Sequence, residues 1–127
     1  MLVFSLFMTA LLSFTMIGFG LVFIKHPPKD INAVYGYRTR MSSINEDTWS
    51  FAHHYSGVFW KRSGTIMLLL SLPVIILMRD FPHYEDYMLI LFYFQMAALL
   101  AVIPMTEKSL KRTFDKEGRR KEYGAIN

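Results

Sequence analysis

The sequence predicts an all-α membrane protein with three transmembrane helices and a structured cytoplasmic loop and helix between the first two. Three stretches without any charged residue stand out: Leu2 to Ile24, Ser63 to Met78, and Tyr87 to Met105. A helix needs roughly 20 apolar residues to cross a bilayer, and the second stretch reaches that length if it starts near Trp60. None of them alternates as barrel strands do. The segment between the first two stretches is instead rich in charged, amide, hydroxyl, imidazole and indole groups, more than a simple turn requires.

The first stretch is expected to remain in the membrane as a helix. It lacks the positively charged start and the Ala-x-Ala site of a cleaved signal peptide. Pro27 and Pro28 end this helix, and Gly36 gives the following segment the backbone freedom for a turn. Small and hydroxyl-bearing residues recur along one side of the helix, where another helix can approach closely: Ser5, Thr9, Ser13 and Gly20.

The second helix is expected to begin at Ser43, well before its apolar part. Ser43 and Glu46 have the spacing of a capping box, in which each side chain bonds a backbone amide of the other residue. No proline follows until Pro73, so the helix either runs into the membrane without a break or starts as a separate helix at the membrane surface. One face of this helix carries aromatic residues, an imidazole and glycines at steps of three and four: Trp49, His53, Gly57, Trp60 and Gly64.

The third helix contains one strongly polar residue, Gln95. We expect its amide to hydrogen-bond a neighbouring helix rather than a ligand, because most polar groups buried in a membrane do so. The domain organisation expected is a three-span membrane domain over residues 1–107, followed by a basic cytoplasmic tail over residues 108–127. The mixed charges of that tail favour an amphipathic helix.

The distribution of Lys and Arg predicts the orientation. The segment from Lys25 to Arg62 carries six of them and the tail carries seven, whereas the connection after the second stretch has only Arg79 and the N-terminus has none. The positive-inside rule therefore predicts a multi-pass protein of the bacterial plasma membrane, with the N-terminus outside and the C-terminus cytoplasmic. The net charge of +4 then reflects topology and contact with membrane lipids, not nucleic acid. Without cysteine, disulfide and thiolate chemistry are excluded.

Three roles remain open for the polar segment. In a structural cap, Arg38 would stack on Trp49 or pair with Glu46 or Asp47. A metal or catalytic site would use Glu46, Asp47, His53 and His54. Glu46 and His53 are seven residues apart, about 10.5 Å along a helix, which is too far for one ion. His53 and His54 are adjacent and face apart, and no catalytic motif is present. We therefore expect no metal and no cofactor. The third role is a recognition surface for a peptide, a lipid headgroup or a partner protein.

The order and spacing of the polar residues resemble the signature of the SdpI family of small bacterial membrane proteins. In that family an Asn-x-x-x-Gly-x-Arg-Thr element precedes a Trp-x-x-x-His-x-x-x-Gly element, and the interval between the two agrees here without a gap. Arg40 departs from the proline that is common after the Arg-Thr pair. Eight positions carry the resemblance: Asn32, Gly36, Arg38, Thr39, Glu46, Trp49, His53 and Gly57.

The resemblance implies a function. The best-understood member of the family is an immunity protein against a secreted, membrane-active toxin, and it also signals by holding a repressor at the membrane. For this chain we expect tolerance to an antimicrobial peptide or toxin, with a toxin peptide and a cytoplasmic regulator as partners, and with the eight residues as functional candidates without a catalytic role. The alternative is a membrane enzyme or lipid-handling protein that uses the segment from Asn32 to Gly57. The connection around Asp80 to Asp86 is the expected place of first contact with a toxin.

Overall fold

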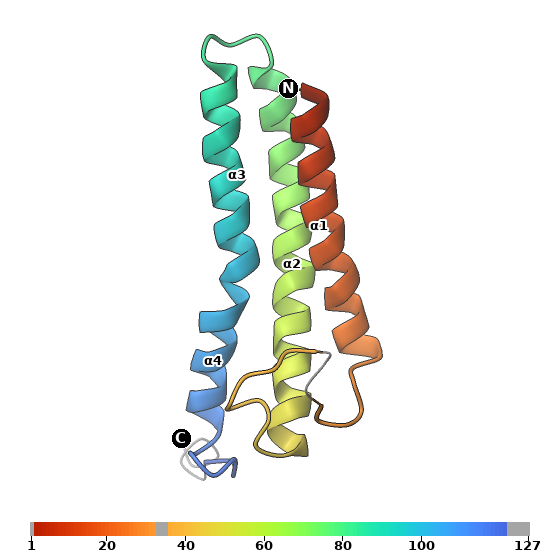
Figure 1. Cartoon of the computed structure of the whole chain (residues 1–127), viewed down its shortest axis with the longest axis vertical. Helices are drawn as coiled ribbons and strands as arrows, with labels where there is room; N and C mark the ends of the chain where they lie inside the picture. Colours follow the sequence, from red (N-terminus) through yellow and green to blue (C-terminus); the bar gives the residue numbers. More distant parts are fainter. Residues whose placement is uncertain (1, 33–35, 122–127) are drawn as a thin grey trace.

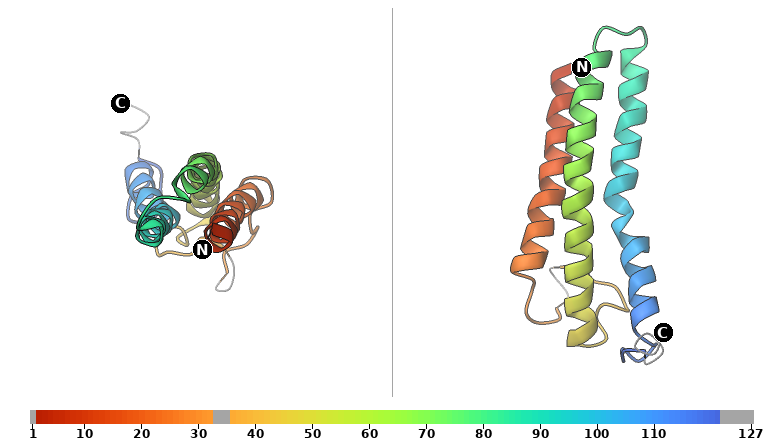
Figure 2. Two further views of the ribbon diagram at one scale, coloured as in Figure 1. Left: turned by 90° about the horizontal axis from the view of Figure 1, so that it is seen from above. Right: turned by 180° about the vertical axis from the view of Figure 1, so that it is seen from behind.

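The computed structural model describes residues 2–32 and 36–121 of the chain. In these residues it has four helices: α1 (Leu2–Lys25), α2 (Glu46–Met78), α3 (Tyr84–Leu100) and α4 (Val102–Thr113). Figures 1 and 2 show α2 between α1 on one side and α3 with α4 on the other. The α2–α3 turn and the start of α1 lie at one end of the molecule, and the α1–α2 segment and the end of α4 lie at the other.

The predicted fold class is confirmed. Three helical stretches are long and apolar enough to cross a membrane, over residues 2–25, 46–78 and 84–113, and the described residues contain no β-strand. The outward faces of these helices carry large exposed apolar side chains, which a protein surrounded by water rarely presents over so wide an area. Examples are Phe7, Leu69, Leu77 and Phe94.

The contact between α1 and α2 brings two backbones together. A Cβ atom added to Gly20 would lie only 2.7 Å from the carbonyl oxygen of Gly57, and one added to Gly57 would lie 2.8 Å from the carbonyl oxygen of Gly20. Only glycine at both positions permits this distance. The packing face predicted for the first helix is confirmed, because all its expected members are buried: Ser5, Thr9, Ser13 and Gly20.

Gln95 joins all three membrane-spanning elements. Its buried amide donates one hydrogen bond to the hydroxyl of Thr9 on α1, at 2.8 Å, and another to the hydroxyl of Ser71 on α2, at 3.1 Å. The predicted interhelical role of Gln95 is therefore confirmed. Both amide hydrogens are used within the bundle, as expected where no water is available to satisfy them.

The predicted start of the second helix at Ser43 was wrong. The N-cap is Asn45, whose side-chain oxygen accepts from the backbone N–H of Thr48 at 2.8 Å, while the Thr48 hydroxyl accepts from the N–H of Asn45 at 3.1 Å. This pair forms a capping box two residues later than expected, satisfying the amides of Asn45 and Thr48 rather than those of Ser43 and Glu46. The N–H of Ser43 instead donates to the carbonyl of Thr39 in the preceding turn. From Glu46 the helix then runs unbroken through Pro73, for about 50 Å. The sequence left open whether the first part of this helix is separate from the membrane span; in the structure the two form one continuous helix.

The third apolar stretch spans two helices rather than one. α3 ends at Leu100 and α4 begins at Val102, with Ala101 between them. α4 continues past residue 107, so the expected tail begins inside a helix. After Thr113 the chain turns back through Gly118, which has φ +82°. Residues 122–127 of the expected tail lie outside the described residues.

Candidate functional site

Most of the sequence-predicted functional residues lie at the end of the molecule where three segments meet. These segments are residues 26–32, residues 36–59 with the first turns of α2, and residues 102–121 with α4; together we call them the cap. The cap lies at the opposite end from the α2–α3 turn (Figure 1). Its polar groups form two connected hydrogen-bond networks.

The first network centres on His53, whose side chain is fully buried. Its Nε2 accepts the backbone N–H of Tyr37 at 2.9 Å, and its Nδ1 lies 2.8 Å from the carbonyl oxygen of Trp49. Because Nε2 accepts, the proton must sit on Nδ1 and be donated to Trp49. The geometry therefore assigns a neutral imidazole with one tautomer.

Neighbouring groups hold the His53 ring in this position. The indole N–H of Trp49 donates to the carbonyl of Pro28 at 2.8 Å, which ties the exit from α1 to the start of α2. The imidazole lies 4.4 Å from the Trp49 ring and meets the Phe23 ring edge-on at 5.0 Å, measured between ring centroids. Gly36, with φ +110°, comes so close that a Cβ there would lie 2.5 Å from Nε2. A side chain at this position would displace the ring.

The second network links the loop to α4 through Glu107. One carboxylate oxygen of Glu107 accepts the hydroxyl of Tyr37 at 2.7 Å and the hydroxyl of Thr39 at 2.8 Å. Burial, and then the hydrogen bond to Glu107, raise the pKa of the Tyr37 hydroxyl, which therefore remains a donor. The buried hydroxyl of Ser42 closes the loop by donating to the carbonyl of Tyr37 at 3.0 Å and accepting the N–H of Thr39 at 2.8 Å. Tyr37 thus belongs to both networks.

The segment after α4 folds onto the start of α2. Phe114 is buried and its ring meets that of Phe51 edge-on, with 5.4 Å between centroids. The Arg120 guanidinium forms two hydrogen bonds with the carboxylate of Asp47, at 2.9 and 3.0 Å, and also lies over the Phe114 ring. The carbonyl of Gly118 accepts the Asn45 amide at 2.8 Å. The tail is therefore a part of the cap, joined to the N-terminus of α2 by apolar, ionic and polar contacts.

The structure brings together only some of the eight predicted residues. Gly36, Thr39, Trp49 and His53 take part in the networks of the cap. Gly57 belongs to neither network and lies in the α1–α2 contact. Asn32 donates its amide to the carbonyl of Asp30 at 3.0 Å. The side chains of Arg38 and Glu46 are exposed, and Asp47, one partner considered for Arg38, pairs with Arg120.

Sequence reasoning missed five residues that hold the cap together: Tyr37, Ser42, Asn45, Glu107 and Phe114. Glu107 carried a signal, since it is the first charged residue after a long apolar stretch, but its partners lie almost 70 positions earlier in the chain. No rule of local spacing connects positions so far apart. Within the described ranges, no three His, Asp or Glu side chains are placed to hold a metal ion.

A second feature lies at the opposite end of the bundle, between α1 and α3. It is a cleft of about 460 Å³ with mainly apolar walls, lined among others by Phe4, Met8 and Phe92. The acidic side chains of Glu85 and Asp86 line one part of it, and Gln95 lines another. We call it the α1–α3 cleft. Its volume falls within the usual range of small-ligand sites.

Comparison with known proteins identifies the family. A model of the SdpI/YfhL protein family matches residues 29–106, more than half of the chain. The chain belongs to the SdpI/YfhL family. It is also similar to the "Uncharacterized protein YfhL" of Bacillus subtilis (strain 168), with 37% identity over 100 residues that cover 76% of this chain and 79% of that protein. No solved structure matches the chain.

Family membership confirms the resemblance that the polar segment suggested and supports a multi-pass membrane protein. The matched residues contain the α1–α2 segment from Lys29, all of α2 and α3, and the start of α4. They include Tyr37, Thr39 and His53, and Glu107 is the residue directly after the match.

Proposed function

We propose that this SdpI/YfhL family protein gives a bacterial cell tolerance to a membrane-active peptide toxin by binding the toxin in the α1–α3 cleft. The observation that carries the proposal is the combination of apolar walls with two carboxylates, Glu85 and Asp86, at the end of the bundle opposite the basic cap. Peptides that act on membranes typically place Lys and Arg on one face and large apolar residues on the other. The cleft offers a complementary surface to both faces.

The surroundings of the cleft support the same occupant. Asp80 in the α2–α3 turn is exposed, and its ion pair with Arg79 is long, at 3.7 Å. This end of the molecule carries an excess of acidic groups, because Asp80 adds to Glu85 and Asp86 and the same stretch contains a single arginine. Under the orientation that the positive-inside rule predicts, this end faces the outside of the cell. A secreted cationic peptide would meet this acidic end before it reached the cap.

In this proposal the cap keeps α1, α2 and α4 in register rather than touching the toxin. Its signalling role, through a cytoplasmic regulator, would depend on the exposed basic side chains of the tail, such as Lys108 and Arg112. An enzymatic role for the cap is disfavoured because both ring nitrogens of His53 already hold backbone groups. A His53→Ala variant should therefore lose stability in detergent; a variant that stays fully stable but inactive would favour an enzyme.

The test is survival of a sensitive bacterial host that expresses the full chain while exposed to a panel of cationic membrane-active peptides. We expect the unchanged protein to raise the inhibitory concentration of at least one peptide, and Glu85→Gln/Asp86→Asn to abolish the gain. The matched control, Asp30→Asn/Glu117→Gln, removes two exposed carboxylates at the cap end and should retain protection. Equal killing with and without the protein, across the panel, would refute the tolerance role. Equal protection by both double variants would refute the cleft as the binding site.

A further inference from the structure

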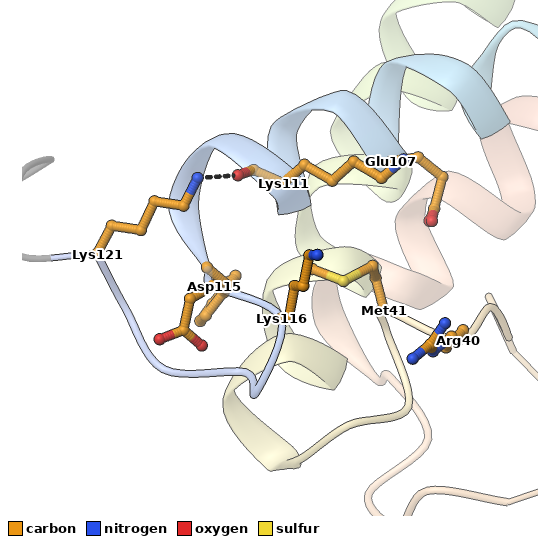
Figure 3. Close-up of a pocket in the computed structure, with 8 residues that line it drawn as sticks. Arg40, Met41, Glu107, Lys111, Asp115, Lys116 and Lys121 are labelled. Atoms are coloured by element: carbon orange, nitrogen blue, oxygen red, sulfur yellow. Dashed lines mark hydrogen bonds between the residues drawn. The ribbon is translucent and has the colours of Figure 1, made fainter.

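A groove of about 740 Å³ lies on the cap between the loop after Gly36 and the end of α4 (Figure 3). Its cationic side chains come from three segments: Arg40 from the loop, Lys111 from α4, and Lys116 and Lys121 from the chain after α4. The half-buried Met41 provides an apolar floor, to which the almost fully buried Phe114 adds little surface. We call this feature the basic groove; neither the eight motif residues nor the α1–α3 cleft contributes to it.

The positive charge of the basic groove is only partly neutralised by the two acids that line it. Glu107 accepts two hydroxyl groups of the loop. Asp115 accepts the backbone N–H groups of Arg119 and Glu117, both at 2.9 Å, and lies 3.5 Å from the Arg119 side chain. By contrast, in the described part of the chain the side chains of Arg40, Lys111 and Lys116 form no ion pair. Three cations around one groove call for an anionic ligand.

The position of the groove relative to the membrane argues for a lipid as the source of that anion. The exposed apolar surface of the third membrane-spanning stretch ends at Ile103 and Met105, and Lys111 follows six residues later, about 9 Å further along α4. The headgroup layer on one side of a bilayer is about 5–7 Å thick, and lysine side chains extend back toward it along apolar surface. Phosphates of the surrounding lipids therefore lie within reach of the groove. A free inorganic anion would gain nothing from contact with the apolar floor of the groove.

We propose that the basic groove binds the phosphate headgroup of an anionic glycerophospholipid, with the glycerol and first acyl carbons against Met41. Arg40, Lys111 and Lys116 would share the phosphate oxygens. Arg40 would bind them through its planar pair of N–H groups. Because these cations come from the loop and from the tail, one bound lipid would bridge the two segments. The lipid would thereby fix the cap to the membrane surface. This role is independent of the toxin proposal.

The test uses the full chain in neutral detergent, titrated with phosphatidylglycerol that carries a fluorophore on an acyl chain. Phosphatidylcholine labelled in the same way is the neutral comparison. Each Lys or Arg near an anionic lipid surface strengthens binding about fivefold, so Lys111→Gln/Lys116→Gln should weaken phosphatidylglycerol binding about 30-fold. Arg40→Gln, from a different segment, should weaken it about fivefold. The matched control Lys61→Gln/Arg62→Gln removes two exposed cations of α2 outside the groove and should bind as the unchanged protein does.

Each outcome bears on the proposal. Selective loss in the groove variants, with unchanged melting temperatures, supports it. Equal loss in the control pair would overturn it, because the attraction would then be diffuse charge and not a site. Tight phosphatidylcholine binding would overturn it as well. Displacement of the lipid by submillimolar inorganic phosphate, or by an acidic peptide at equal charge, would assign the groove to a soluble anion or to a protein partner and would also overturn it.

Discussion

Replacing Gly57 with alanine should push α1 and α2 apart. The new methyl group would lie 2.8 Å from the carbonyl oxygen of Gly20, and 3.0 Å from side-chain carbons of Phe23 and Ile24. Ordinary contacts of a Cβ begin at 3.4 Å, so the helices must separate locally by about 0.6 Å. Since the nearest atom belongs to a helix backbone, no side-chain rotation relieves the contact.

The magnitude follows from two opposing effects. Overpacking of this kind costs about 1–3 kcal/mol, whereas alanine favours a helix over glycine by about 1 kcal/mol. Gly18 separates the two effects, because a Cβ there has nothing within 4 Å. Gly18→Ala should gain the propensity without the clash. We therefore expect the free energy of unfolding of Gly57→Ala to lie about 1–3 kcal/mol below that of Gly18→Ala.

Gly20 provides a second check on the same contact. Gly20→Ala should be destabilised by a similar amount, since its Cβ would lie 2.7 Å from the Gly57 carbonyl oxygen. Once one alanine has separated the helices, the second has less left to displace. The double variant should therefore lose less than the sum of the single losses, by at least about 0.5 kcal/mol.

The assay is unfolding of the full chain in mixed micelles, followed by circular dichroism as the fraction of denaturing detergent is raised. The reasoning is refuted if Gly57→Ala and Gly18→Ala unfold alike, or if the losses at Gly20 and Gly57 add in full. Either result would mean that the two backbones do not approach as closely as the glycines indicate.

Substitutions at three further positions test the polar contacts in the same assay. Trp49→Phe keeps an aromatic side chain but removes the N–H donated to Pro28 and leaves part of the buried indole volume empty, and should cost about 2–3 kcal/mol; no loss would mean that this residue does not stabilise the cap. Glu107→Leu leaves the Thr39 hydroxyl without its acceptor and the Tyr37 hydroxyl with only the carbonyl of Ile103, 3.2 Å away, and should cost about 1–3 kcal/mol, whereas Glu107→Gln, which keeps an acceptor, should cost about half as much. Gln95→Leu removes two interhelical hydrogen bonds of about 0.6 kcal/mol each, so a loss near 1 kcal/mol is expected and a more stable variant would contradict it.

The sequence by itself determined the three membrane-spanning stretches and the packing face of α1. Whether a segment can cross a bilayer depends on its length and its lack of charge, which are local properties of the sequence. A stripe of Ser, Thr and Gly at helical spacing likewise predicts a close helix contact, but it does not identify the partner helix. The polar signature between Asn32 and Gly57 identified the family for a similar reason, since it is an ordered pattern within one segment. Even the role of Gln95 followed from its being alone in an apolar helix.

Only the tertiary structure decided what the polar segment contacts. Tyr37 and Thr39 meet Glu107 across 70 and 68 positions of sequence, and Asp47 pairs with Arg120 across 73 positions. Spacing along a helix could align Trp49 with His53, yet it could not show that both nitrogens of His53 are held by backbone groups. Contacts of this kind depend on how α4 and the chain after it fold back onto α2. No local pattern encodes them, because the free energy that selects them comes from packing between distant segments.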